Sequence, residues 1–450
     1  MLARSHSPRG SIQGKLTLAF ALLAGATPGL AVVWTAAQAV ETALRQSPDA
    51  AMAHQRVEVA EAMIAQARAA WYPQLSLAGR YTATNSPQVA FGAILNQRAF
   101  NFGLDFNHPG QIDNLNVSGT VAYNFYSGGR ATAGRTAAEA GARAAEQDLQ
   151  VARHQLAAEA VKTLLALRKA REAVTAVEAG VRAYEAAVAN SRLRFDAGQV
   201  LKADLLSLEV QLAQTRETLS ATRHGAALAA RAFLFVLGLE PTAGETIELA
   251  PDDAVLAALT APAGDDVSSR PELAGLKERV RAAEAMVEAA RGARRPAVNA
   301  FASYQYDEGW KLGRHGDSWL AGVAVDVNLF DGGQTAGKIR QASAELAQAR
   351  EMQRKVRLAL GLEVEQARLA HADARERLAV SAQAVAQAEE SASLSRARFE
   401  KGALLAADLI GVESRLIETR MRRTAAEADE RIALIELRRA LGVPPLPDQP

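Results

Sequence analysis

The chain of 450 residues is long enough for two or three ordinary domains or for one elongated domain. Its 51 lysines and arginines nearly balance its 50 aspartates and glutamates, which argues against a nucleic-acid-binding protein because such proteins carry excess positive charge. Since there is no cysteine, disulfides, thiolate metal sites and a lipid-modified N-terminal cysteine are excluded.

Residues 1–31 have the pattern of a secretory signal peptide, with basic residues, a short apolar run and then small residues. We predict cleavage after Ala31 or Ala26. An N-terminal membrane anchor is the alternative, but the run is short and is interrupted by glycine and proline. No later stretch has 18 uncharged apolar residues, so we expect an exported protein that is either soluble or inserted in a membrane as a β-barrel.

The first regular pattern after this segment is helical and covers residues 35–70. Thr35 is a suitable cap, Pro48 is expected to interrupt the helix and Pro73 to end it. The same segment returns at 271–296, with 12 of 26 positions identical at a constant offset. This return is the first sign that the chain is duplicated.

Each helical segment precedes two segments with the period of two that is typical of β-strands. Apolar side chains and glycines alternate with polar ones over about ten residues, as in transmembrane β-strands, although a half-buried sheet in a soluble protein has the same pattern. We predict strands at 74–84, 115–125, 298–306 and 319–329, joined within each pair by extracellular loops at 85–114 and 307–317. If the polar face lines a lumen, that lumen is lined by Arg80, Asn124, Asp326 and Asn328.

A glycine pair ends the second strand of each half and is followed by 65–70 residues of helical pattern, which would span about 100 Å at 1.5 Å per residue. A segment of 23 residues then occurs twice, at 194–216 and 398–420, with 11 identical positions. Its glycine suits a left-handed helix C-cap, and its aspartate suits the first turn of a new helix. Each copy is therefore predicted to be the tip of a long helical hairpin.

These patterns predict a mainly α-helical chain with a membrane β part, in which a strand pair plus a long hairpin occurs twice. Four strands cannot close a barrel and eight would leave no lumen, whereas three chains give twelve strands, so we predict a homotrimer with a 12-stranded β-barrel, from which the long helices project on one side and form a second, helical tube. The expected parts are a signal peptide (1–31), a first repeat (32–238), a connector (239–270), a second repeat (271–443) and a C-terminal tail (444–450).

Several motifs resemble those of the TolC family of outer-membrane efflux proteins. They are the tips RFDAGQVLKADLLSLE and RFEKGALLAADLIGVE, the turn NLFDGGQTAGKIRQA, and the segments RPELAGLKERVRAAE and RRPAVNAFASY. The resemblance covers about 35–443 and implies a trimeric channel with a 12-stranded barrel in the outer membrane and a long periplasmic extension, a 12-helix α-barrel. The resemblance implies that the connector 239–270 is equatorial. It also implies that the tips dock onto a periplasmic adaptor coupled to an inner-membrane pump, and that the channel has no catalytic activity and no cofactor.

The resemblance assigns the adaptor contact to ten tip residues: Arg194, Phe195, Gly198, Leu201, Asp204, Arg398, Phe399, Gly402, Leu405 and Asp408. The glycines and phenylalanines have an equally good explanation as builders of the turn. Asp408 also falls where the family has a gate aspartate, while Gly411 and Leu404 replace other residues of the family's gate. Pairing with the helix dipole is the alternative for Asp408 and the favoured explanation for Asp204.

Two functions fit these patterns best. The first is the outer-membrane channel of a tripartite efflux system, and the second is the exit duct of a type I protein secretion system. A soluble periplasmic coiled-coil adaptor is disfavoured, because an adaptor needs one hairpin between small β-domains and this chain has two hairpins. An enzyme is disfavoured further, since the sequence has no nucleophile constellation, phosphate loop or metal motif.

Overall fold

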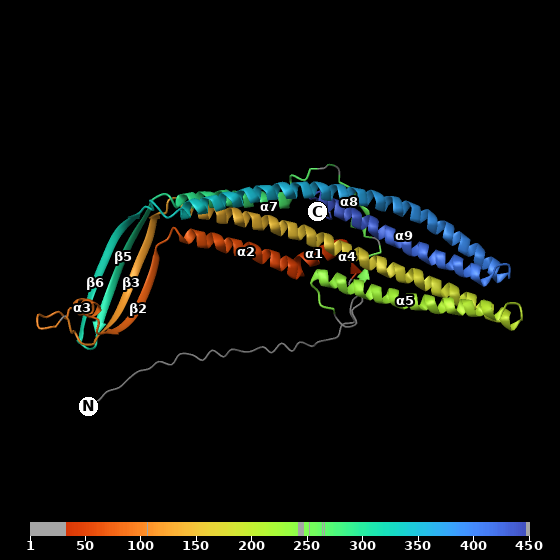
Figure 1. The fold of residues 1–450 in the computed structure, drawn as a ribbon. Helices are drawn as coiled ribbons and strands as arrows, with labels where there is room; N and C mark the ends of the chain where they lie inside the picture. Colours follow the sequence, from red (N-terminus) through yellow and green to blue (C-terminus); the bar gives the residue numbers. More distant parts are fainter. Residues whose placement is uncertain are drawn as a thin grey trace, which may run out of the picture.

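The structure is a computed structural model and describes residues 33–446 except 106, 242–246, 252, 263 and 265. The expected signal peptide and the end of the tail lie outside the described residues. A β-sheet forms one end of an elongated molecule, and two helical hairpins extend away from it to the other end (Figure 1).

Two halves with the same element order form this arrangement, which confirms the predicted duplicated fold. The first half contains α2 (Pro48–Ala69), β2 (Gln74–Thr84), β3 (Ile112–Tyr126), α4 (Arg130–Asp196) and α5 (Lys202–Leu237). The second contains α7 (Pro271–Gly292), β5 (Ala297–Gly309), β6 (Arg314–Asp326), α8 (Gln334–Glu400) and α9 (Ala406–Ala440). The remaining elements are β1 (Val33–Trp34), α1 (Ala36–Gln46), α3 (Pro87–Asn96), β4 (Glu248–Leu249) and α6 (Ala254–Ala257).

The helical pattern of 35–70 forms two helices, α1 and α2, that meet at Ser47, which confirms the interruption expected at Pro48. Thr35 caps α1 in a capping box with Gln38, as the sequence predicted. Ser47 caps α2, and Pro48 occupies its first turn, where proline has no hydrogen bond to lose. Both long helices, α4 and α8, have 67 residues, which confirms the length expected for each.

The sheet is antiparallel with the strand order β2-β3-β5-β6. Its register places the apolar residues of all four strands on one face, as Leu75 faces Val121 and Tyr304 faces Trp319. This face is uncovered in the single chain: Leu75 is 80% exposed and Trp319 is 77% exposed.

Several predicted strand boundaries are wrong, most of them in the second half. The second-half loop is shorter than the expected 307–317, because β5 runs to Gly309 and β6 begins at Arg314. The hydrogen-bonded pairing of β5 with β6 continues over these extra residues. Their side chains are mostly polar, so the alternating hydrophobicity that marks a strand in the sequence is absent from them. At its other end β6 stops at Asp326, so Asn328, expected on the polar face of a strand, lies outside the sheet.

The helical part has its largest core where α1, α4 and α5 meet. Val161, Leu164 and Phe233 are fully buried there, and the Trp34 ring meets Phe233 edge to face with centroids 5.5 Å apart. Nearby, the buried side chain of Arg270 at the start of α7 binds Glu272, Glu363 on α8 and the carbonyl of Ala440 on α9. Arg270 therefore links the connector to α8 and α9 of the second hairpin.

Candidate functional site at the helical tips and on the sheet

The two hairpins end in turns of the same construction, as predicted. Gly198 (φ 69°) and Gly402 (φ 76°) are left-handed. The amides of Gly198 and Gln199 donate to the carbonyls of Phe195 and Arg194, both at 2.8 Å. The second tip repeats both bonds with its corresponding residues. This is a Schellman cap, and it explains why both glycines are present without any binding role.

Two ion pairs join the two helices of each hairpin behind its tip, at corresponding positions in both hairpins. In the first hairpin Arg192 binds Glu209 and Arg216 binds Glu185, both at 2.7 Å. In the second hairpin the corresponding pairs are Arg396–Glu413 and Arg420–Glu389. Sequence analysis missed these pairs, although both glutamates after the tip belong to the identical positions of the repeated segment.

The corresponding pairs differ in burial. Glu413 has a side chain only 2% exposed and takes two bonds from Arg396, one of them 2.7 Å from Nη2 to Oε2. The hydrogen bonds that Arg396 donates to Glu413 hold the pKa of Arg396 above its ordinary value, while burial opposes this rise. Glu209 is 33% exposed, so its pair lies largely in solvent, where ion pairs contribute little.

The tips also contact each other, and they do so asymmetrically. Arg194 of the first tip donates to the carbonyl of Phe399 in the second at 2.9 Å. Its guanidinium lies over Gly402, where an added Cβ would approach Nη2 to 2.4 Å. Arg398, the counterpart of Arg194, reaches only the carbonyl of Ala403 in its own turn, at 3.5 Å. Phe399 is 5% exposed in this contact, whereas Phe195 is 36% exposed.

Asp204 and Asp408 both lie in the first turn of a return helix, where the helix dipole favours a carboxylate. Asp204 is half-buried and Asp408 is exposed, as are Leu201 and Leu405 at the caps of the two helices. This location satisfies the dipole explanation for both aspartates and leaves the Asp408 carboxylate accessible from outside the chain.

On the sheet, three of the four expected polar-face residues do share a face. Arg80 lies opposite Asn116, and Asn124 donates to Asn299 Oδ1 at 2.7 Å. Asn299 in turn donates to Asp326 at 3.1 Å. A row of hydrogen-bonded polar side chains therefore crosses β3, β5 and β6 on the face opposite the apolar residues.

Helix α3 was not predicted and lies at the far end of this polar face. Gln97, which follows it, is fully buried and donates to the Asp113 carbonyl at 2.7 Å and to Asn114 Oδ1 at 2.8 Å. Asn114 donates to the buried carboxylate of Asp307 at 2.6 Å. An added Cβ at Gly309 would lie 2.2 Å from Gln97 Oε1, so this glycine permits the segment after α3 to pack closely against the sheet.

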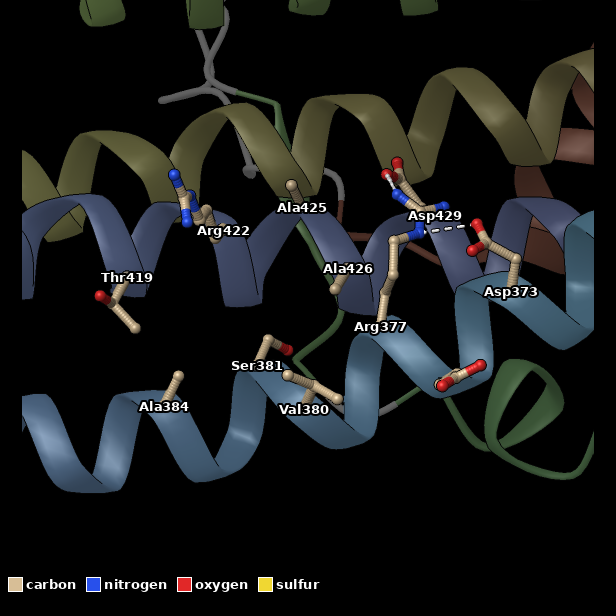
Figure 2. Close-up of a pocket in the computed structure, with 11 residues that line it drawn as sticks. Asp373, Arg377, Val380, Ser381, Ala384, Thr419, Arg422, Ala425, Ala426 and Asp429 are labelled. Carbon is tan, nitrogen blue, oxygen red and sulfur yellow. Dashed lines mark ion pairs between the residues drawn. The ribbon is translucent and has the colours of Figure 1, made fainter.

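A groove of about 630 Å³ lies between α8 and α9, several helical turns from the tip. Figure 2 shows Thr419 and Ala384 at one end of it and the Arg377–Asp429 ion pair at the other, with Arg422 and Ser381 between them. Throughout the described residues, no helix is long and apolar enough to cross a membrane. The same part of the chain contains no cluster of His, Asp and Glu side chains suited to a metal ion.

An elongated chain with two helical hairpins and one exposed apolar sheet defines the class of an outer-membrane channel subunit. Residues 39–239 and 267–443 match the outer membrane efflux protein family, and the chain belongs to that family. The chain is an outer-membrane protein and belongs among transport proteins, not enzymes. The soluble-adaptor alternative is therefore wrong.

Individual relatives are distant. The outer membrane efflux protein BepC of Brucella suis biovar 1 is 26% identical over 297 residues, which cover 63% of this chain and 62% of BepC. The match thus spans less than two thirds of that relative. Among solved structures, CusC superposes with a TM-score of 0.76 at 17% identity over 92% of this chain and 93% of its own. VceC from Vibrio cholerae has a TM-score of 0.73 at 20% identity, over 91% and 96%. These likenesses establish the fold.

Proposed function

We propose that three copies of the chain form the passive exit duct of a tripartite efflux system. The sheet supports this proposal most directly, because β2 and β6 are its edges and its apolar face is exposed. Open edges invite pairing with further strands, and an apolar exterior with a polar interior is the pattern of a barrel in lipid. Three copies of the four-stranded sheet give twelve strands.

In this proposal each repeat (32–238 and 271–443) contributes two strands to the barrel and one hairpin to a periplasmic α-barrel. The connector 239–270 lies at the equator. The polar face with Arg80, Asn124 and Asp326 lines the lumen. The exposed tips around Leu201, Asp204, Leu405 and Asp408 dock onto a periplasmic adaptor, which couples the duct to an inner-membrane pump.

The test is the mass of the detergent-extracted particle from isolated outer membranes, combined with deletion of the chain in its own host. We expect a trimer, and we expect the deletion strain to retain small toxic compounds. A monomer would contradict the barrel. A trimer whose loss leaves small compounds unaffected but blocks export of a protein would replace the efflux duct with a type I secretion duct.

If Asp408 forms a ring at the periplasmic end of this trimer, Asp408→Ala will reduce cation selectivity in planar bilayers. Three carboxylates close together concentrate cations near a narrow opening, and alanine removes all three charges. Asp204→Ala is the matched control, since it removes a carboxylate from the same helical turn of the other tip. Unchanged conductance and selectivity in Asp408→Ala would leave only the helix-dipole role.

The position of α3 leads to a prediction for the opposite end of the duct. Because Gln97 holds the α3 segment on the polar face, Gln97→Ala is expected to release it and increase single-channel conductance. Loss of the bonds to buried Asn114 costs about 1–3 kcal/mol. The control is Arg98→Ala, which removes an exposed ion pair to Asp317 worth at most about 1 kcal/mol. Equal conductance in the two variants would argue against an anchoring role for Gln97.

A further inference from the structure

The contact between the two hairpins of one chain, called the internal contact below, indicates how a second copy of the chain would pack against the first. Within one chain, α4 of the first hairpin packs against α9 of the second. The hairpins correspond residue by residue at a constant offset of 204, as in Arg194 and Arg398. Repeating the contact once more, as a cyclic assembly requires, places α8 of one copy against α5 of the next.

The centre of the internal contact is the pair Gly180 and Ile417. An added Cβ at Gly180 would lie 2.2 Å from Ile417 Cδ1 and 3.8 Å from Thr215 Cγ2. The counterparts of Gly180 and Thr215 are Ala384 and Thr419, which line the groove between α8 and α9 in Figure 2. The groove that holds Ile417 in the first hairpin is therefore open in the second.

The side chains that the next copy would bring to this groove fit it. The counterpart of Ile417 on α5 is Ala213. The glycine–isoleucine pair within the chain therefore corresponds to an alanine–alanine pair, Ala384 and Ala213, between copies. Ala213 is exposed in the single chain. Neither contact therefore places two large side chains together.

A second position exchanges polar residues for apolar ones on both sides at once. Internally, the Tyr184 hydroxyl is 2.8 Å from Ser414 Oγ and donates to the Ile410 carbonyl. The counterparts are Ala388 for Tyr184 and Val210 for Ser414, so no buried hydroxyl is left without a partner. Val210 is 56% exposed, as expected for a residue that a second copy covers.

A third position exchanges two uncharged side chains for two of opposite charge. Thr218 and Met421 line the same cavity between α5 and α9. Their counterparts are Arg422, which lines the groove in Figure 2, and Glu217, which is exposed. A second copy would bring this glutamate to the arginine.

We propose that α5 of a neighbouring copy occupies the α8–α9 groove in this register, with Ala213 at Ala384 and Glu217 at Arg422. At the tip, Arg398 then donates to the Phe195 carbonyl of the neighbouring copy, as Arg194 does to Phe399 within the chain. Gly198 has open space around it in the single chain, which leaves room for the incoming guanidinium. This inference rests on the proposed trimer.

The register can be tested by crosslinking, because the chain has no cysteine. In Ala213→Cys/Ala384→Cys we expect a disulfide between copies, which gives dimer and trimer bands on non-reducing gels after oxidation in membranes. Ala213→Cys/Ala386→Cys is the control, since Ala386 lies on another side of α8 and is exposed. Gly180→Cys/Ile417→Cys should crosslink within one chain and shows that the oxidant reaches this contact.

The outcomes separate the register from the trimer. Bands from the 213/384 pair alone support the register. A trimer by mass without those bands, or with equal bands from the 213/386 control, overturns the register and leaves the trimer intact. A monomer by mass overturns the proposed function and this inference together.

The tip contact has its own test in planar bilayers. We expect Arg398→Ala to raise single-channel conductance as much as Arg194→Ala does, because each loses one of two equivalent contacts in the ring of tips. Lys401→Ala removes the same charge from the same turn and should leave conductance unchanged. If Arg398→Ala behaves like Lys401→Ala while Arg194→Ala raises conductance, Arg398 does not bind the next copy.

Discussion

Replacing Arg270 by alanine is expected to lower the free energy of unfolding of the second hairpin by about 1–3 kcal/mol, the usual cost of leaving a buried hydrogen-bond acceptor without its donor. The Arg270 side chain is 3% exposed. It binds Glu363 at 2.7 Å and Glu272 at 2.5 Å, and donates to the Ala440 carbonyl at 2.8 Å. Alanine would remove these contacts and leave the last turn of α9 without its capping donor.

The ionisation of this cluster makes the effect depend on pH. Burial disfavours charge on Arg270, but bonds to Glu272 and Glu363 hold its pKa above the ordinary value. Burial would raise the pKa of Glu272, but the hydrogen bond from Arg270 lowers it below the ordinary value of 4.5. A carboxylate with a lowered pKa in the folded state stabilises the fold above its ordinary pKa, and this stabilisation is lost as the pH falls through the folded value.

Hydrogen exchange of the amides of α7 and the C-terminal end of α9 measures this prediction, since it reports local stability in an assembled particle. The difference between wild type and Arg270→Ala should be large at pH 7 and should shrink below about pH 4.5. The control is Arg350→Ala, which also breaks a link between α8 and α7, but one to Glu284 with both side chains about half exposed. Equal, small effects of both variants would contradict the role assigned to Arg270.

The parts of the fold that sequence analysis predicted are those where the backbone demands a particular residue or period. Gly198 and Gly402 stand where only glycine readily adopts the left-handed cap, so the tips were found to within a residue. Thr35 and Pro48 marked helix starts for the same reason. Long helices and strands were recognised because their period persists over many residues.

What could not be predicted depends on contacts between distant segments. Helix α3 is short, and its position depends on Gln97 meeting Asn114 and on close approach at Gly309. The role of Arg270 follows from residues 93 and 170 positions away. Nothing in the local pattern of either segment distinguishes it from an exposed loop.

The candidate site shows the same limit in another form. Phe195 and Phe399 are identical in their repeated motif, yet one is exposed and the other buried. The two phenylalanines differ because the first tip packs against Phe399 within the chain, whereas Phe195 stays exposed in a single chain. A repeat alignment therefore finds the tip residues but not their separate environments.

The last prediction uses this difference, because the chain carries two versions of one ion pair. Arg396→Ala is expected to destabilise the second tip by about 3 kcal/mol, since it leaves the carboxylate of Glu413 buried without a cation. Arg192→Ala removes the corresponding pair with Glu209, whose two side chains are 63% and 33% exposed, and should cost at most about 1 kcal/mol.

Hydrogen exchange of the amides in the last turns of α8 and the first turns of α9 provides the measurement, with the last turns of α4 and first turns of α5 compared in the control. Faster exchange should be confined to the second tip in Arg396→Ala. A double variant, Arg396→Leu/Glu413→Leu, should recover much of the protection, because removing both charges avoids the unpaired carboxylate. If the double variant is no better than Arg396→Ala, the stability of the tip depends on the arginine's packing and not on the charge that it neutralises.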